Sequence, residues 1–306
     1  MNKGINVFSV FDGMSCCHLA VDKAGIMVES YRSSELLMLE GKNGKLRPNP
    51  AVLITQYNYP KTIQLGDIRN INGRLYRGLI QLYVGGSPCQ SFSNAGTRSG
   101  FDGKSGLFWE WVRLWKEIQP EFWLLENVEM KKEYEDVISE TLGVFPYHIN
   151  SDLVSGQNRP RVYWTNIPYT PIEDKEIMLG DVVLGAICGT NTHGEPIGPN
   201  PLRPGKFLYK HNGYIDSVKN KGCCLVRGRG HYRNIQGEVK GYTPEDAEGL
   251  QNVTKGYTNV PGVCNTARHE VLGNGMTVDV LVEAFFKNLP WATKVDTEIV
   301  NKLTVK

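Results

Sequence analysis

A cysteine at the end of a short buried strand is the residue of this sequence best placed for covalent chemistry. The apolar run 79–84 predicts that strand, and a Gly-Gly-Ser-Pro turn over 85–88 then leads the chain into Cys89. A thiol held in a loop at the carboxyl end of a strand faces the crevice in which such sheets bind ligands, so Cys89 is a candidate nucleophile. A buried cysteine that only fills space is the alternative interpretation.

The composition is that of a globular protein with a sizeable core. The chain has 306 residues, of which 41% are hydrophobic and 22% charged, and its net charge is +2. Seven cysteines contain no Cys-x-x-Cys pair, so neither a zinc site nor another metal site is predicted. The odd cysteine count, the lack of a signal peptide and the lack of a membrane-spanning stretch predict a cytoplasmic protein.

Strands alternate with helices through the first half of the chain, which predicts an α/β fold with a doubly wound, mostly parallel sheet. The side chains that follow its strands should therefore meet at one edge. We expect strands at 5–11, 27–34, 62–65, 79–84, 122–125 and near 148–149, and helices at 16–24, 50–57, 107–118 and 277–289.

Two of these strand ends suit a nucleotide-like ligand. The first strand runs into Asp12-Gly13-Met14-Ser15, where the glycine lets the backbone approach a ligand at the start of a helix. Glu35 ends the second strand about twenty residues later, where a carboxylate can accept hydrogen bonds from ribose hydroxyls. A plain turn and an exposed strand-end glutamate are the respective alternatives.

Five motifs give the chain its resemblance to the cytosine-5 DNA methyltransferases, because they occur in that family's order. They are Phe11-x-Gly13, Pro88-Cys89-Gln90, Glu126-Asn127-Val128, Gln157-x-Arg159-x-Arg161 and Gly273-Asn274-Gly275-Met276-Thr277-Val278. The resemblance implies the fold of the S-adenosylmethionine-dependent methyltransferases, with a small irregular, β-rich target-recognition domain. The first turn departs from the family's Phe-x-Gly-x-Gly, since it has Ser15 and then Cys17.

The resemblance also implies catalytic roles. Cys89 would add to C6 of a cytosine flipped out of duplex DNA, so that C5 can attack the methyl group of S-adenosylmethionine. A protonated Glu126 would hydrogen-bond N3, Arg161 would contact O2 and hold Glu126, and Arg159 would support the same corner. The expected substrate-binding residues around the base are Ser87, Pro88, Gln90, Asn127 and Gln157.

A cofactor pocket for S-adenosylmethionine is implied in the same way. Phe11 would pack on the adenine, Gly13, Met14 and Ser15 would approach the methionine part, and Glu35 would bind the ribose. The remaining expected contacts are Asp67 and Ile68 at the adenine edge, Leu107 closing the pocket, and Asn274 reaching it from the far end of the chain.

The stretch 168–263 differs in kind from the rest, because it is rich in glycine, proline and asparagine. The stretch from Arg203 to Lys240 contains nine Lys or Arg residues and two acidic residues, which gives a local net charge of +7. Four aromatic residues are interleaved with them. Basic and aromatic residues together suit a nucleic-acid surface, and a solvated loop region is the alternative. We therefore expect a target-recognition domain at 168–263, with Arg227 and Arg229 contacting DNA, and a catalytic domain at 1–167 plus 264–306.

Residues 36–49 form an insertion between Glu35 and the next helix. Leu36-Leu37-Met38-Leu39 is apolar enough that we expect it to pack beside the cofactor crevice. The polar remainder would then form an excursion at the pocket rim that shapes cofactor access. A surface insertion without a role is the alternative, since added loop length has little effect on stability.

Three functions stay open at this point. The first is a monomeric bacterial or phage enzyme of DNA modification that methylates double-stranded DNA, as in restriction-modification. The second is a transfer-RNA cytosine-5 methyltransferase with the same chemistry. The third is a catalytically silent DNA-binding regulator on the same fold, against which Cys89, Glu126 and Arg161 argue.

Overall fold

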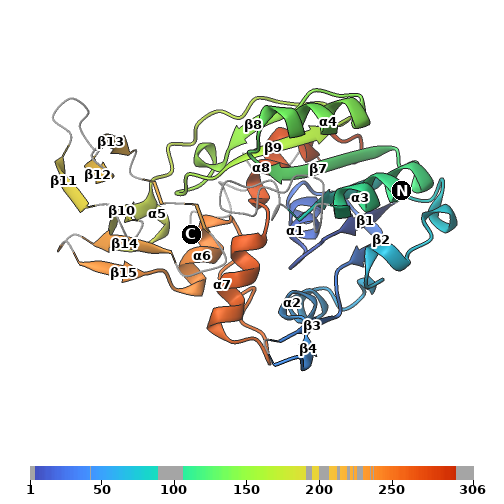
Figure 1. The fold of residues 1–306 in the computed structure, drawn as a ribbon, viewed down its shortest axis with the longest axis horizontal. Coiled ribbons are helices and arrows are strands. Elements are labelled where there is room, and N and C mark those ends of the chain that lie inside the picture. Colours follow the sequence, from blue (N-terminus) through green and yellow to red (C-terminus); the bar gives the residue numbers. More distant parts are fainter. Residues whose placement is uncertain are drawn as a thin grey trace.

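The central element is a seven-stranded sheet with the order β5-β2-β1-β6-β7-β9-β8 (Figure 1). The computed structural model describes residues 4–41, 43–88, 106–190, 195–199, 207–211, 214–218, 221–222, 224–225, 230–234, 236 and 238–293. The strands are β1 (Ile5–Val10), β2 (Val28–Ser34), β5 (Ile63–Gln64), β6 (Leu82–Gly86), β7 (Phe122–Val128), β8 (Tyr147–Asn150) and β9 (Pro160–Thr165). All are parallel except β9, which pairs antiparallel with β7 and β8, so the predicted fold class is confirmed.

Both faces of this sheet are buried, because alternate residues of the central strands are apolar on each side. Val7, Leu82 and Leu124 belong to one hydrophobic cluster. Their neighbours Phe8, Tyr83 and Leu125 belong to a second one on the opposite face. Continuous apolar strands of this kind are typical of parallel sheets covered by helices on both sides.

Helices cover both faces of the sheet. The first cluster includes residues of α1 (Cys16–Lys23), α2 (Pro50–Asn58) and α8 (Val278–Ala284). The second includes residues of α3 (Leu107–Ile118), which coincides with the predicted helix, and of α4 (Lys132–Leu142). Among the described helices, none is long and apolar enough to cross a membrane.

The last helix is shorter than the expected 277–289. It ends at Ala284, and a 3₁₀ turn, η5 (Phe286–Asn288), follows. Phe285 leaves the helical conformation, with φ −131° and ψ −58°, and is fully buried with its ring close to those of Tyr163 and Tyr169. Packing of this ring against the sheet therefore replaces the final helical turns.

Two small antiparallel sheets lie to one side of the main sheet, at the left of Figure 1. One contains β10 (Ala186–Thr190), β14 (His231–Asn234) and β15 (Val239–Gly241), and the other β11 (Glu195–Pro199), β12 (Phe207–His211) and β13 (Tyr214–Val218). Short helices α5 (Leu179–Val182) and α6 (Pro244–Leu250) flank them, and α7 (Asn265–Asn274) returns the chain to the main sheet. These sheets are the β-rich part that the resemblance implies.

The end of the 168–263 stretch packs on the main core. Leu250, Val253 and Tyr257 are buried in the same cluster as α1, and the Tyr257 hydroxyl donates to the Met14 carbonyl at 2.8 Å. The expected domain border at 263 thus stays a prediction, while the elements set apart from the main sheet are β10 to β15 (Figure 1).

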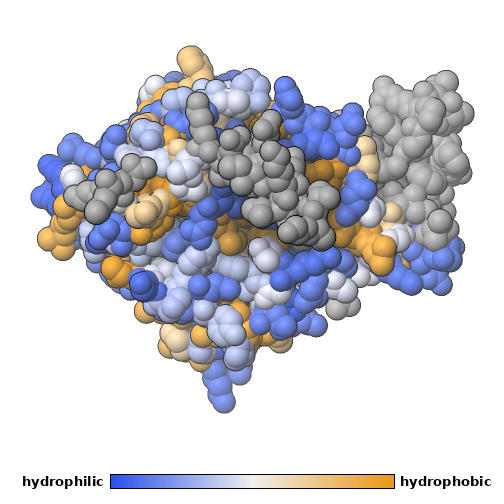
Figure 2. Space-filling view, turned by 180° about the vertical axis from the view of Figure 1, so that it is seen from behind, coloured by the Kyte–Doolittle hydropathy of each residue, from blue (hydrophilic) through white to orange (hydrophobic). Residues whose placement is uncertain are grey.

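The insertion forms a β-hairpin, with β3 (Met38–Glu40) paired to β4 (Leu46–Pro48). Leu36, Leu37 and Met38 are 44–46% exposed, so the expectation that this apolar run is packed out of solvent is wrong, while its place beside the cofactor crevice stays a prediction. A two-stranded ribbon satisfies its own backbone hydrogen bonds and can project from the body with its side chains half covered. The hairpin lies at the bottom of the molecule, where Figure 2 shows a narrow hydrophilic projection.

A buried ion pair fixes the segment that joins the small sheets to α7. Glu248 is fully buried and accepts hydrogen bonds from the backbone N–H groups of Gly256, at 2.6 Å, and Thr258, at 2.8 Å. Its charge is met by Arg268 Nη2 at 3.2 Å, whose side chain is 4% exposed. A buried charge that loses its partner is strongly destabilising.

Arg268→Ala should therefore lower the free energy of unfolding by about 3–5 kcal/mol, because it leaves the Glu248 carboxylate buried and unpaired. Arg69→Ala is the control: Arg69 pairs with Asp67 at the surface, and its loss should change stability by at most about 1 kcal/mol. Urea unfolding followed by circular dichroism measures both values, and equal effects would contradict the assignment.

Candidate active site

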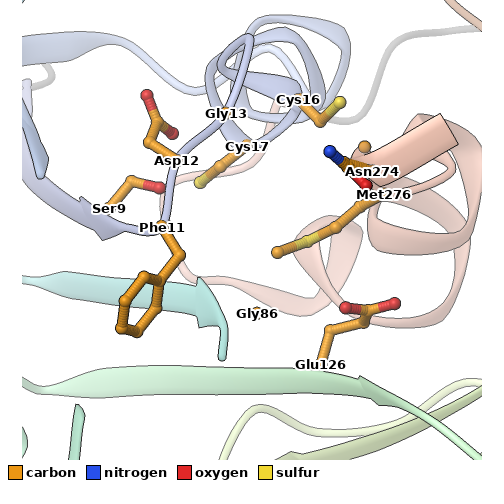
Figure 3. Close-up of a pocket in the computed structure, with 11 residues that line it drawn as sticks. Ser9, Phe11, Asp12, Gly13, Cys16, Cys17, Gly86, Glu126, Asn274 and Met276 are labelled. Atoms are coloured by element: carbon orange, nitrogen blue, oxygen red, sulfur yellow. The ribbon is translucent and has the colours of Figure 1, made fainter. Parts of the chain in front are cut away.

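A pocket opens where the ends of β1, β6 and β7 meet the start of α1 and the segment after α7 (Figure 3). About 370 Å³ within it is not filled by atoms, and part of this space is open to solvent. Of the expected site residues, Phe11, Gly13, Glu126 and Asn274 line it. Lining residues to which the sequence assigned no role are Ser9, Asp12, Cys16, Cys17, Gly86, Gly275 and Met276.

The turn between β1 and α1 is built from alternating left-handed residues. Phe11, Gly13 and Ser15 have φ values of 52°, 56° and 63°. Asp12 holds the turn from inside, because its carboxylate accepts hydrogen bonds from the hydroxyls of Ser15 and, at 2.8 Å, Tyr31. Gly13 consequently faces the pocket, whereas Met14 and Ser15 are fully buried behind it.

Glu35 lies against the same turn. Its carboxylate accepts hydrogen bonds from the backbone N–H of Gly13 at 3.0 Å, that of Leu36 at 3.2 Å and Nδ2 of Asn49 at 3.1 Å. Burial raises the pKa of Glu35, the charge of Asp12 raises it as well, and these hydrogen bonds oppose the shift. Asn49 therefore contacts Glu35, the residue expected to bind the ribose. The sequence analysis did not identify this contact.

The adenine-edge residues lie outside the pocket lining. Asp67 forms an ion pair with Arg69, and hydrogen bonds from Arg69 hold the pKa of its carboxyl below the usual range. Ile68 is buried in the second core cluster, and Leu107 packs on that cluster at the start of α3. The roles of these three residues at the cofactor stay predictions.

Glu126 and Arg161 form a largely buried ion pair at the floor of the pocket. Glu126 stands near the end of β7 with its carboxylate pointing toward Met276 and Asn274 (Figure 3). Arg161 Nε lies 3.1 Å from its Oε1, and the two side chains are 12–13% exposed. Burial raises the pKa of Glu126, while the guanidinium groups of Arg161 and Arg159 oppose that shift.

Arg159 is fully enclosed and binds backbone carbonyls. Its guanidinium donates to the carbonyl oxygens of Leu225 at 2.6 Å, Gly273 at 3.0 Å and Gly275 at 2.8 Å. It thereby holds the segment that carries Asn274 and Met276 over the pocket. Burial, together with the like charge of Arg161, lowers the pKa of Arg159.

Two other expected substrate contacts are buried in the protein. The Asn127 side chain donates to Ser87 Oγ at 3.0 Å and so fixes the turn toward Pro88, which ends the described part of that strand exit. Gln157 donates to Gln251 Oε1 at 3.0 Å and accepts from the backbone of Leu225 at 3.3 Å. Both amides therefore hold the loops around the pocket.

Some of the expected site residues lie outside the described residues. They are Cys89, Gln90, Arg227 and Arg229, and residues 94–105 of the loop that follows Cys89 lie outside as well.

The chemistry of the residues at the pocket is compatible with S-adenosylmethionine. The space beside the Gly13 Cα is open to at least 4 Å on the side where a side chain would stand, so a ligand can approach the backbone there. Phe11 and Met276 supply apolar surface in the pocket, and the Glu35 carboxylate, an acceptor for hydroxyl groups, lies next to it against the Gly13 N–H. Elsewhere in the described part of the chain, no cluster of His, Cys, Asp or Glu side chains could bind a metal ion.

The strand order and the antiparallel β9 define the fold of the S-adenosylmethionine-dependent methyltransferases. The crystal structure of a putative DNA modification methyltransferase encoded within a prophage of Escherichia coli shares it, with a TM-score of 0.61 and 17% identity over 93% of this chain and 98% of that one. The family described as C-5 cytosine-specific DNA methylase matches residues 5–173. The chain belongs to this family.

Two curated relatives bear out the membership. The orphan methyltransferase M.SPRI of Bacillus phage SPR is 30% identical over 184 residues, which cover 56% of this chain and 40% of that protein. The type II methyltransferase M.NgoPII of Neisseria gonorrhoeae is 32% identical over 126 residues, covering 40% of this chain and 33% of that protein. This chain thus spans well under half the length of these relatives.

Arg161→Met should raise the pKa of Glu126 further, because it removes the largest influence that opposes burial. A carboxyl whose pKa is raised on folding stabilises the protein below its ordinary pKa, and that contribution is lost as the pH rises through the folded-state value. The variant should therefore lose up to about 3–5 kcal/mol at pH 8 and much less at pH 5.

The ¹³C shift of the Glu126 carboxyl, followed against pH, measures this directly. Arg161→Lys retains a cation and is the control. An unchanged Glu126 titration in Arg161→Met would contradict the proposed coupling.

Proposed function

We propose that this protein transfers a methyl group from S-adenosylmethionine to C5 of a cytosine flipped out of duplex DNA. The observation that carries the proposal is the largely buried Glu126–Arg161 pair beside the Phe11–Ser15 turn, in a chain of the cytosine-specific family. This places an acid with a raised pKa and a fixed guanidinium at one side of a pocket whose other side suits the cofactor.

Three residues of the chain have separate roles in the proposed reaction. The thiolate of Cys89 adds to C6 of the cytosine, and the electron density displaced toward N3 is met by a proton on Glu126. Arg161 donates to O2 and keeps Glu126 oriented. When bound, the cofactor supplies an electrophilic methyl group for C5. The C5 proton then passes to water, the C5–C6 double bond forms again, and the C6–Sγ bond breaks to release the Cys89 thiolate.

The framework around these groups supports their positions. Asn127 fixes Ser87 at the exit of β6, just before Cys89. Arg159 keeps the segment 273–276 over the pocket, opposite Glu126. Reacting groups held in this way lower the entropic part of the barrier.

We infer that residues 168–263 recognise the DNA target, while residues 1–167 and 264–306 carry catalysis. The net charge of +7 between Arg203 and Lys240 supplies the attraction to phosphates. Arg227 and Arg229 are the proposed contacts, because arginine can bind phosphate or read guanine bidentately. The protein acts on duplex DNA as a monomer in this proposal.

Plasmid DNA from cells that produce the protein should retain cytosines after bisulfite treatment within one short sequence. Cys89→Ser should slow methyl transfer by at least about 10³-fold, because a serine hydroxyl is a much weaker nucleophile at neutral pH. Purified protein with labelled cofactor should mark duplex DNA and leave transfer RNA unlabelled. Label in transfer RNA alone would move the substrate to RNA, and label in neither would overturn the activity.

Arg227→Glu with Arg229→Glu should weaken binding of duplex DNA by at least about tenfold and leave cofactor affinity unchanged. If these residues contact phosphates, the slope of log affinity against log salt concentration should fall by about one per contact. If they read guanine, the free-energy discrimination against a wrong base pair should fall by about 1–3 kcal/mol per base pair. Lys131→Glu with Lys132→Glu, at the exposed start of α4, is the control with the same change in charge. Equal DNA affinity in both double variants would place recognition elsewhere.

A further inference from the structure

The carboxylate of Glu35 is nearly saturated by hydrogen bonds from the protein. Oε2 accepts from the Gly13 N–H, and Oε1 accepts from the Leu36 N–H and from Asn49 Nδ2. A carboxylate offers about four acceptor positions, so these described contacts leave about one, on the oxygen that also binds Gly13. The orientation of the carboxylate therefore decides whether that last position faces the pocket turn.

Asn49 supplies one of these bonds from the far end of the insertion. Its side chain is buried, and Nδ2 donates both to Glu35 and, at 2.7 Å, to the Leu36 carbonyl. Its own N–H donates to the Leu37 carbonyl at 3.0 Å and so closes the base of the hairpin. The same side chain connects both ends of the insertion to the carboxylate.

The other half of the Asn49 side chain begins the next helix. Oδ1 accepts from the Ala51 N–H at 3.0 Å, and Pro50 follows at the first helical position. Asp or Ser would cap this helix as well as Asn. An ionised Asp has no donor, whereas the Asn amide caps the helix with its oxygen and donates to the carboxylate with its nitrogen, which is a requirement beyond capping.

We propose that Asn49 is a positioning residue for Glu35, and that the insertion serves the cofactor site through its base and not through its tip. The inference rests on the proposed ribose contact of Glu35. Asn49 turns the carboxylate so that its remaining acceptor position on Oε2 faces the Gly13 turn. The exposed apolar residues of the hairpin have no part in this role.

The electrostatic surroundings of Glu35 also make the Asn49 hydrogen bond important. Asp12 is the charged group that acts on Glu35, and it raises the pKa of Glu35 in addition to burial, while the Asn49 amide favours the ionised form. A ribose hydroxyl donates to the remaining position of the ionised carboxylate, so cofactor affinity falls as the pH drops through the pKa of Glu35. Removal of the Asn49 donor shifts that fall to higher pH.

Asn49→Asp tests the proposal, because it keeps the capping oxygen and replaces the donor with an acceptor. Cofactor affinity measured by calorimetry at neutral pH should fall about tenfold. In the ligand-free protein, the ¹³C titration of the Glu35 carboxyl should move to higher pH. Asn49→Ser keeps the cap without adding charge, and should shift both quantities in the same direction by less.

Two controls separate the outcomes. Replacement of residues 41–45 by Asn-Gly shortens only the hairpin tip, and should leave affinity and titration unchanged. Glu35→Gln tests the ribose contact itself, and full affinity in that variant would refute the proposed function of Glu35. Weak binding by Glu35→Gln, with an unaltered Glu35 titration and affinity in Asn49→Asp, would overturn the present inference alone.

Discussion

The site depends on the hydrogen bonds that the enclosed guanidinium of Arg159 donates to backbone carbonyls. The guanidinium binds carbonyl oxygens of Leu225 and of the segment 273–275, which are far apart in the sequence. Arg159 and Arg161 are two residues apart on β9, so their side chains leave the same face of the strand. One strand thus delivers two cations to one place, the first to assemble the walls of the pocket and the second to hold Glu126.

The ionisable groups around the pocket differ in position and in protonation, and their surroundings set both. Asp12 and Glu35 lie on the side that suits a cationic cofactor, and Glu126 lies on the side proposed for the base. Burial raises the pKa of the Cys16 thiol to about 12 and raises that of Cys17 well above the usual value. Both thiols therefore carry their protons at neutral pH and act as small apolar wall residues, leaving the nucleophile role proposed for Cys89 without a competitor among them.

Much of the main sheet could be predicted because its signals are local. The apolar run at 5–11 and the helical spacing at 107–118 gave elements close to those observed, since buried strands and amphipathic helices leave periodic patterns. Phe11, Gly13 and Glu126 also line one pocket, because the ends of parallel strands converge, and Asn274 reaches it from the end of α7.

The two failures arise from contacts that the residue types concerned do not reveal. The end of α8 depends on the packing of Phe285 against strands distant in the sequence, and the exposure of Leu36 and Leu37 depends on a ribbon that pairs with itself. The partners of Gln157 and Asn49 come from segments that no sequence pattern joins to them. Which amide would hold a loop and which would face a ligand was therefore not readable from residue type.

Ser15 shows what the family's Phe-x-Gly-x-Gly pattern encodes at its last position. It adopts the left-handed conformation, with φ 63°, which a glycine reaches without steric strain. Its hydroxyl bonds to Asp12 and lies 2.9 Å from Thr55 Oγ1, and these contacts offset a strain of about 1–2 kcal/mol. Glycine and a bonded serine are thus two solutions for one backbone shape, and a pattern search that requires glycine there would pass over chains that build the same turn.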